Sequence, residues 1–93
     1  MAKTRTTVRI AGRDYPISSS DSEAYVQRVA RYVDRKINEL SLATRLNALD
    51  SATLAAMTIA DELAKTQVEL TRLRAQLEQE RAAFHAQRGE DQA

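Results

Sequence analysis

Large apolar residues recur every seven positions through the second half of the chain, between Asp50 and Arg88. The repeat consists of Leu63, Leu70, Leu77 and Phe84, and no proline or glycine interrupts the run. This spacing is typical of a helix that packs along a partner helix. At about 1.5 Å per residue such a helix would be roughly 58 Å long. Because the remaining residues are too few to cover it, the pattern predicts that the chain self-associates.

The seam of this helix alternates between apolar and polar layers. Ile59 and Leu73 lie three residues after a seam position, whereas Thr66 and Glu80 occupy the equivalent places in other repeats. Such a seam gives modest stability but fixes the register and orientation of the partners. The periodicity is compatible with two helices and with four. The residues expected in the oligomerisation seam are Leu63, Leu70, Leu73, Leu77 and Phe84.

The long helix also changes character along its length. It is expected to begin with Asp50 or Ser51 as its N-cap, and up to Ala64 it is rich in alanine with apolar residues on more than one face. That part is expected to pack in a globular head, residues 1–64, against a first helix and its equivalent from a partner. Residues 65–88 read as a solvated coiled-coil stalk, and residues 89–93, from Gly89 onward, as a frayed tail.

Two short alternating segments near the N-terminus predict a β-hairpin over residues 4–17. The first runs from Thr4 to Ile10, the second begins at Arg13, and Gly12 between them can adopt the positive φ of a tight turn. Pro16 has no amide hydrogen, so its strand is expected to lie at an edge. The apolar face of the hairpin needs a cover, because an isolated hairpin is only marginally stable in water.

That cover is expected from a first helix over residues 21–40. Ser20 and Glu23 have the spacing of a capping box, and residues 41–49 read as a connection to the long helix. The apolar stripe of the first helix consists of Val26, Val29, Ala30, Val33, Ile37 and Leu40. The predicted fold class is therefore α+β, in which the hairpin and the amphipathic helix form a dimeric head that precedes a long coiled-coil helix.

Composition restricts the chemistry. The net charge is +1, which argues against coating of nucleic acid through bulk electrostatics. There is no cysteine, and no apolar run is long enough for a membrane span or a signal sequence, so a cytoplasmic protein is expected. The single histidine, His85, has no second histidine to join it in a metal site. We expect no catalytic residues, no cofactor and no metal.

Basic residues alternate along the hairpin, and they allow two interpretations. Arg5 and Arg9 share a strand face, with Lys3 and Arg13 nearby. They form either a ribbon that meets an acidic protein surface or a DNA groove, or a solvated edge whose charge prevents strand aggregation. A strand followed by two helices is also similar to ribbon-helix-helix repressors. This DNA-binding alternative is weakened by the second strand, the long terminal helix and the low net charge.

The order of elements, together with local sequence, resembles the ZapA family of cell-division proteins. The resemblance covers about residues 6–73 and includes Thr-Thr-Val-Arg-Ile-Ala-Gly-Arg-Asp-Tyr-Pro-Ile at 6–17 and Leu-Ala-Ala-Met-Thr-Ile-Ala-Asp-Glu-Leu at 54–63. It implies a dimeric head, with two dimers joined through their long helices into an elongated tetramer. It also implies binding to FtsZ filaments and their lateral bundling at the mid-cell division site, with bridging but not binding lost when the coiled coil is removed.

The resemblance further implies which residues contact FtsZ. In the family the arginine after the turn glycine is implicated, and here that residue is Arg13. Arg9 is added as a second candidate contact only because of the strand face on which it lies. The family pattern can carry a second basic residue further along the strand, whereas this chain has Pro16 there, so the basic patch is expected to be smaller or built differently.

Overall fold

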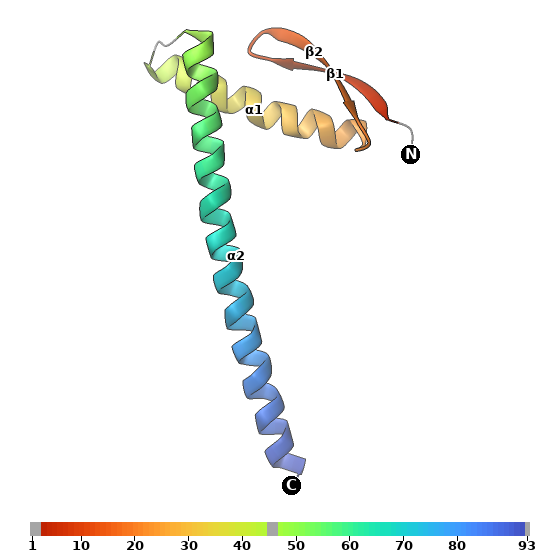
Figure 1. Cartoon of the computed structure of the whole chain (residues 1–93), viewed down its shortest axis with the longest axis vertical. Helices are drawn as coiled ribbons and strands as arrows, with labels where there is room; N and C mark the ends of the chain where they lie inside the picture. Colours follow the sequence, from red (N-terminus) through yellow and green to blue (C-terminus); the bar gives the residue numbers. More distant parts are fainter. Residues whose placement is uncertain (1–2, 45–46, 93) are drawn as a thin grey trace. The chain divides into compact units, whose positions relative to one another are not determined.

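A computed structural model describes residues 3–44 and 47–92, and these form two strands and two helices. The elements are β1 (Thr4–Ile10), β2 (Arg13–Ser19), α1 (Glu23–Thr44) and α2 (Ala48–Gln92), as Figure 1 shows. They fall into two compact units, Met1–Ile59 and Ala60–Ala93, here called the head unit and the C-terminal unit. The first 12 residues of α2 belong to the head unit. The expected α+β order of hairpin, helix and long helix is confirmed.

The hairpin is closed by a two-residue turn at Ala11 and Gly12. Both have positive φ, 53° and 79°, as a turn that matches the twist of the strands requires. Glycine adopts this conformation without strain, but alanine does not. The amide of Ala11 donates a hydrogen bond to Asp34 Oδ1 of α1 at 2.8 Å, which holds the turn against the helix.

The strands pair in antiparallel register from Ile10 opposite Arg13 to Thr4 opposite Ser19. β2 therefore extends two residues beyond the expected end at Ile17. Ser18 and Ser19 continue the ladder opposite Arg5 and Thr4. Ladder pairing with β1 overrides the weak strand preference of serine, so the sequence pattern placed the end too early.

The core of the head unit lies between β1 and α1. Val8, Val26 and Ala30 are buried together, with Ile10 packed against them. Gln27 Nε2 donates to the carbonyl oxygen of Thr7 at 2.9 Å, a second link between helix and strand. The expected cover is thus present over β1. β2 is covered less than β1, because its residues Tyr15 and Ile17 remain 41% and 37% exposed.

The ends of α1 differ from the sequence prediction. The helix begins at Glu23 rather than Asp21, and its N-cap is Ser22, whose Oγ accepts the amide hydrogen of Tyr25 at 3.2 Å. Ser20 is not the cap. In a run of serines and an aspartate each residue is a competent cap, and the apolar stripe alone does not choose among them. At the other end α1 continues to Thr44, beyond the predicted end at Leu40.

α2 is capped by Asn47, three residues before the earlier of the two predicted caps. Asn47 Oδ1 accepts the amide hydrogen of Asp50 at 2.8 Å, and Asn47 Nδ2 donates to Asp50 Oδ2 at 3.2 Å. Asn47 therefore acts as the N-cap, and its side-chain amide also binds the Asp50 carboxylate. Most of the expected connection at 41–49 is therefore helical. Arg45 and Leu46, which belong to that expected connection, lie outside the described residues.

The last turn of α2 passes through Gly89 and ends at Gln92, not at Arg88. A glycine inside a helix costs only about 1 kcal/mol relative to alanine. Termination by glycine usually uses the left-handed conformation, and among the described residues positive φ occurs only at Ala11 and Gly12. Gly89 therefore does not end the helix. The expected tail at 89–93 is helical as far as it is described.

Candidate functional site

The two arginines singled out on the hairpin lie on opposite faces of it. The register places Arg9 opposite Asp14, and Arg13 opposite Ile10. Paired residues share a face and successive residues alternate, so Arg13 lies on the face of Val8, which is turned toward α1. Arg9 lies with Arg5 on the other face. One flat surface cannot contact both Arg9 and Arg13 equally.

Arg9 is held by a surface ion pair. Its Nη1 lies 3.1 Å from Asp14 Oδ1, and the two side chains are 68% and 63% exposed. A pair this exposed contributes at most about 1 kcal/mol. Arg9 can therefore exchange Asp14 for a carboxylate of a partner at little cost.

Arg13 borders an apolar hollow in the head unit. Two depressions of about 270 and 610 Å³ lie between β2 and the helices, and Ile10 and Ile17 line both. We call them together the apolar groove; its most exposed large residues are Tyr15, Ile17, Tyr25, Val29 and Leu49. Arg13 lines the larger depression. A contiguous apolar surface of this kind is typical of an interaction site.

A second apolar surface runs along α2 in the C-terminal unit. Its residues are the predicted seam, and in the single chain they are between 44% and 61% exposed: Leu63, Leu70, Leu73, Leu77 and Phe84. Residues separated by seven, three or four positions lie on one side of a helix. The seam is therefore an apolar stripe available to another helix, interrupted by polar layers at Thr66 and Glu80.

The part of α2 inside the head unit packs through a different set of residues. Ser51 and Ala55 are the fully buried residues there, at 0% and 1% exposure. Ser51 Oγ also accepts a hydrogen bond from Ser41 Oγ of α1 at 2.8 Å. Both are small residues, four positions apart on the same side of α2. Leu54 and Met57 stay exposed on other sides of the helix, so apolar residues do occupy more than one face here, as the sequence indicated.

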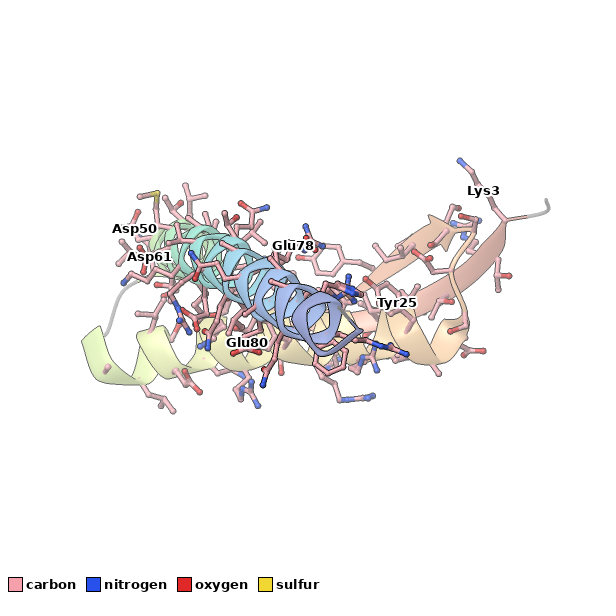
Figure 2. The ribbon with its side chains drawn as sticks, turned by 90° about the horizontal axis from the view of Figure 1, so that it is seen from below. Lys3, Tyr25, Asp50, Asp61, Glu78 and Glu80 are labelled. Carbon is pink, nitrogen blue, oxygen red and sulfur yellow. The ribbon has the colours of Figure 1, made fainter. Side chains whose placement is uncertain are left out.

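Charged residues flank the seam in short-range pairs. Lys65 Nζ lies 2.8 Å from Asp61, and Arg72 Nη2 lies 2.6 Å from Glu69. The hydrogen bond from Arg72 lowers the pKa of the Glu69 carboxyl, and the hydrogen bond and charge of Asp61 raise the pKa of Lys65. Figure 2 shows Glu78 and Glu80 on opposite sides of α2, so they form no carboxylate pair. These are solvated flanks of a coiled-coil helix.

The described residues contain no group of three or more His, Cys, Asp or Glu side chains able to hold a metal ion. His85 contacts the edge of Phe84, with ring centroids 6.0 Å apart. Neither helix, over its described length, is long and apolar enough to cross a membrane.

The hairpin bears on the ribbon-helix-helix alternative. In that fold each chain supplies one strand, which pairs with the same strand of a second copy. Here β1 pairs along its whole length with β2 of the same chain. The fold therefore does not support the DNA-binding alternative.

Sequence reasoning gave no role to a row of arginines on the exposed side of α1. Arg28, Arg31 and Arg35 line a depression of about 440 Å³ together with Tyr32. The signal was present, because spacings of three and four place all three guanidinium groups on one helix face.

Comparison with known proteins gives a consistent result. The family model described as "Cell division protein ZapA" matches residues 6–89. The cell division protein ZapA of Geobacillus kaustophilus is 42% identical over 80 residues, which cover 85% of this chain and 88% of that protein. ZapA of Bacillus licheniformis is 35% identical over 80 residues, covering 83% and 92%. A solved structure, a ZapA mutant dimer from Geobacillus stearothermophilus, aligns with a TM-score of 0.68 and 42% identity, covering 84% of this chain and 92% of that one.

Proposed function

Since this chain belongs to the ZapA family of cell-division proteins, we propose that it binds FtsZ and cross-links FtsZ protofilaments as a non-enzymatic scaffold. It acts in the cytoplasm at the mid-cell division site. The assembly that does so is a tetramer in which two head dimers are joined through their α2 helices.

The observation that carries this proposal is the presence of two separate apolar surfaces on one small chain. The apolar groove belongs to the head unit and the seam belongs to the C-terminal unit. A single self-complementary surface closes a dimer, whereas two different ones close a tetramer. The groove joins two heads, in keeping with the dimer formed by the related Geobacillus stearothermophilus protein. The seam then joins two such dimers.

Cross-linking follows from the number of heads. A tetramer carries two head dimers, so it engages two filaments at once without any new type of contact. Bivalence also raises the effective affinity, because the second binding event takes place at a high local concentration. A dimer with one pair of heads binds a filament but does not bridge two.

The contact with FtsZ is assigned to Arg13, with Arg9 as a second candidate. Arg13 is fixed at the first residue of β2, directly after the Ala11-Gly12 turn that Asp34 holds against α1. Arg9 lies on the other face of the hairpin. Replacing each arginine by alanine separately therefore also tells which face meets the filament.

The test combines co-sedimentation with polymerised FtsZ and light scattering. The full chain is expected to co-sediment and to increase scattering. Arg13→Ala is expected to lose both while it keeps the oligomeric mass of the full chain, which is measured as well because Arg13 also lines the groove that joins two heads. A full-length variant with Leu70→Lys and Leu77→Lys is expected to co-sediment without increased scattering. The matched control, Thr71→Lys with Gln79→Lys, adds the same charge on the outer side of α2 and is expected to behave as the unmodified chain. Absence of both co-sedimentation and bundling with the full chain would contradict the proposal.

A further inference from the structure

The exposed face of α1 carries a row of cations with few carboxylates near it. The row consists of Arg28, Arg31 and Arg35. Arg35 Nε approaches Glu39 at 3.9 Å, while within the described residues Arg28 and Arg31 form no ion pair with a carboxylate. Three like charges at spacings of three and four repel one another along a helix. A partner that neutralises them removes this repulsion.

The row is turned away from the surfaces already described. Val26, Ala30 and Ile37 are the buried residues of α1. Arg28 lies two residues from both Val26 and Ala30, and Arg35 lies two residues before Ile37. A separation of two residues is about 200° around a helix. A second copy seated in the apolar groove therefore leaves the arginine row accessible.

Two of the three guanidinium groups lie over tyrosine rings. Arg28 Cζ lies 5.3 Å from the centre of the Tyr25 ring, and Arg35 Cζ lies 5.2 Å from that of Tyr32. The attraction between a guanidinium cation and a ring face restrains the side chain. A guanidinium group carries five N–H donors, enough for two parallel hydrogen bonds to a carboxylate as well. The arrangement thus combines positioned cations with an adjacent depression of about 440 Å³.

The size of the row favours one class of partner. From Arg28 to Arg35 the helix rises about 10 Å, a length that suits a short protein segment with two or three carboxylates. Nucleic-acid affinity instead grows with the number of phosphates that are neutralised. Three arginines in a chain of net charge +1 supply few such contacts.

We propose that the exposed α1 face formed by Arg28, Arg31, Tyr32 and Arg35 is a docking surface for an acidic protein segment, separate from the hairpin arginines. It gives the scaffold a second class of binding site. Such a site would let the assembly hold an acidic partner while the hairpins are engaged elsewhere.

The test uses fluorescence anisotropy of labelled octaglutamate with the full chain, at low and at physiological salt. The unmodified protein is expected to bind. The triple variant Arg28→Ala, Arg31→Ala, Arg35→Ala is expected to bind about tenfold more weakly or worse, because charge-assisted hydrogen bonds are lost. A matched control, Lys65→Ala, Arg72→Ala, Arg88→Ala, removes the same charge from α2 and is expected to retain binding. Circular dichroism verifies that each variant keeps its helices.

Two further experiments distinguish specific binding of an acidic protein segment from binding through bulk charge and from binding to other anionic ligands. Replacing the three arginines by lysine keeps the charge but removes the planar donors, so binding is expected to fall. Unchanged affinity in the lysine variant, or an equal loss in the α2 control, would overturn the proposal in favour of bulk charge. Tighter binding to a DNA duplex or to anionic vesicles than to octaglutamate, abolished in the alanine variant, would also overturn it. No binding of octaglutamate at low salt would have the same consequence.

Discussion

Replacing Leu70 and Leu77 together by lysine tests whether the α2 seam joins chains to one another. Both residues lie on the apolar stripe of the C-terminal unit and are exposed in the single chain, at 44% and 47%. Neither contributes to the core of the head unit. The double replacement should therefore remove one self-association surface and leave the head folded.

The expected effect is large. Complete burial of a leucine side chain contributes about 1.5–3 kcal/mol. Covering the roughly half that is still exposed therefore contributes about 1 kcal/mol per leucine. Eight such side chains in a tetramer sum to roughly 8 kcal/mol, which corresponds to between five and six orders of magnitude in the dissociation constant. Buried lysine ammonium groups add a further penalty.

Sedimentation equilibrium measures the outcome directly. With a chain mass of 10.4 kDa, four chains give about 42 kDa and two give about 21 kDa. We expect the larger mass for the unmodified chain and the smaller one for the double variant, with the thermal transition of the head retained. Thr71→Lys with Gln79→Lys should keep the larger mass. An unchanged mass in the Leu70 and Leu77 variant would refute the assignment of the seam.

Three other predictions concern stability. Gly12→Ala should destabilise the chain by about 1–2 kcal/mol in urea unfolding, because φ is +79° there, whereas Gly89→Ala should stabilise α2 by up to about 1 kcal/mol; the opposite ranking would refute the turn geometry. Asn47→Ala should cost about 1 kcal/mol through loss of the cap of α2, and Asn47→Asp should restore most of it. Arg72 lowers the folded-state pKa of Glu69. The stabilisation of the folded chain by this pair is therefore present above the unfolded-state pKa of Glu69 and is lost as the pH falls through its folded-state pKa. Helical ellipticity should therefore decrease slightly more on acidification in the unmodified chain than in Glu69→Gln, and identical acid profiles would contradict the pair.

The periodic features of this fold could be predicted from the sequence because they are local. The heptad residues Leu63, Leu70 and Leu77 and the alternation around Gly12 each depend on neighbouring positions only. Helix ends were predicted less well. Ser22 and Asn47 act as caps in segments that contain other competent caps, so the outcome depends on which backbone amides are left free.

The unequal burial of the two hairpin strands could not be predicted from the sequence. Val8 is 2% exposed and Tyr15 is 41% exposed, although they are paired on the same face. The difference arises because α1 lies against β1 and leaves much of β2 open, which is a tertiary property. For the same reason, the placement of Arg13 beside the groove and of Arg9 on the far face required the register and the helix together.

Pro16 gives the hairpin a further property. Because the hairpin has a two-residue turn, Thr7 and Pro16 form a pair that exchanges no hydrogen bonds across the ladder. The backbone N and C=O of both residues point outward from the hairpin instead. The outer edge of β2 therefore lacks a donor at its centre, where an added strand would need one. The other edge belongs to β1, whose exposed face carries Arg5 and Arg9, and like charges on two copies repel. Neither edge of the hairpin therefore favours the addition of a strand from another copy.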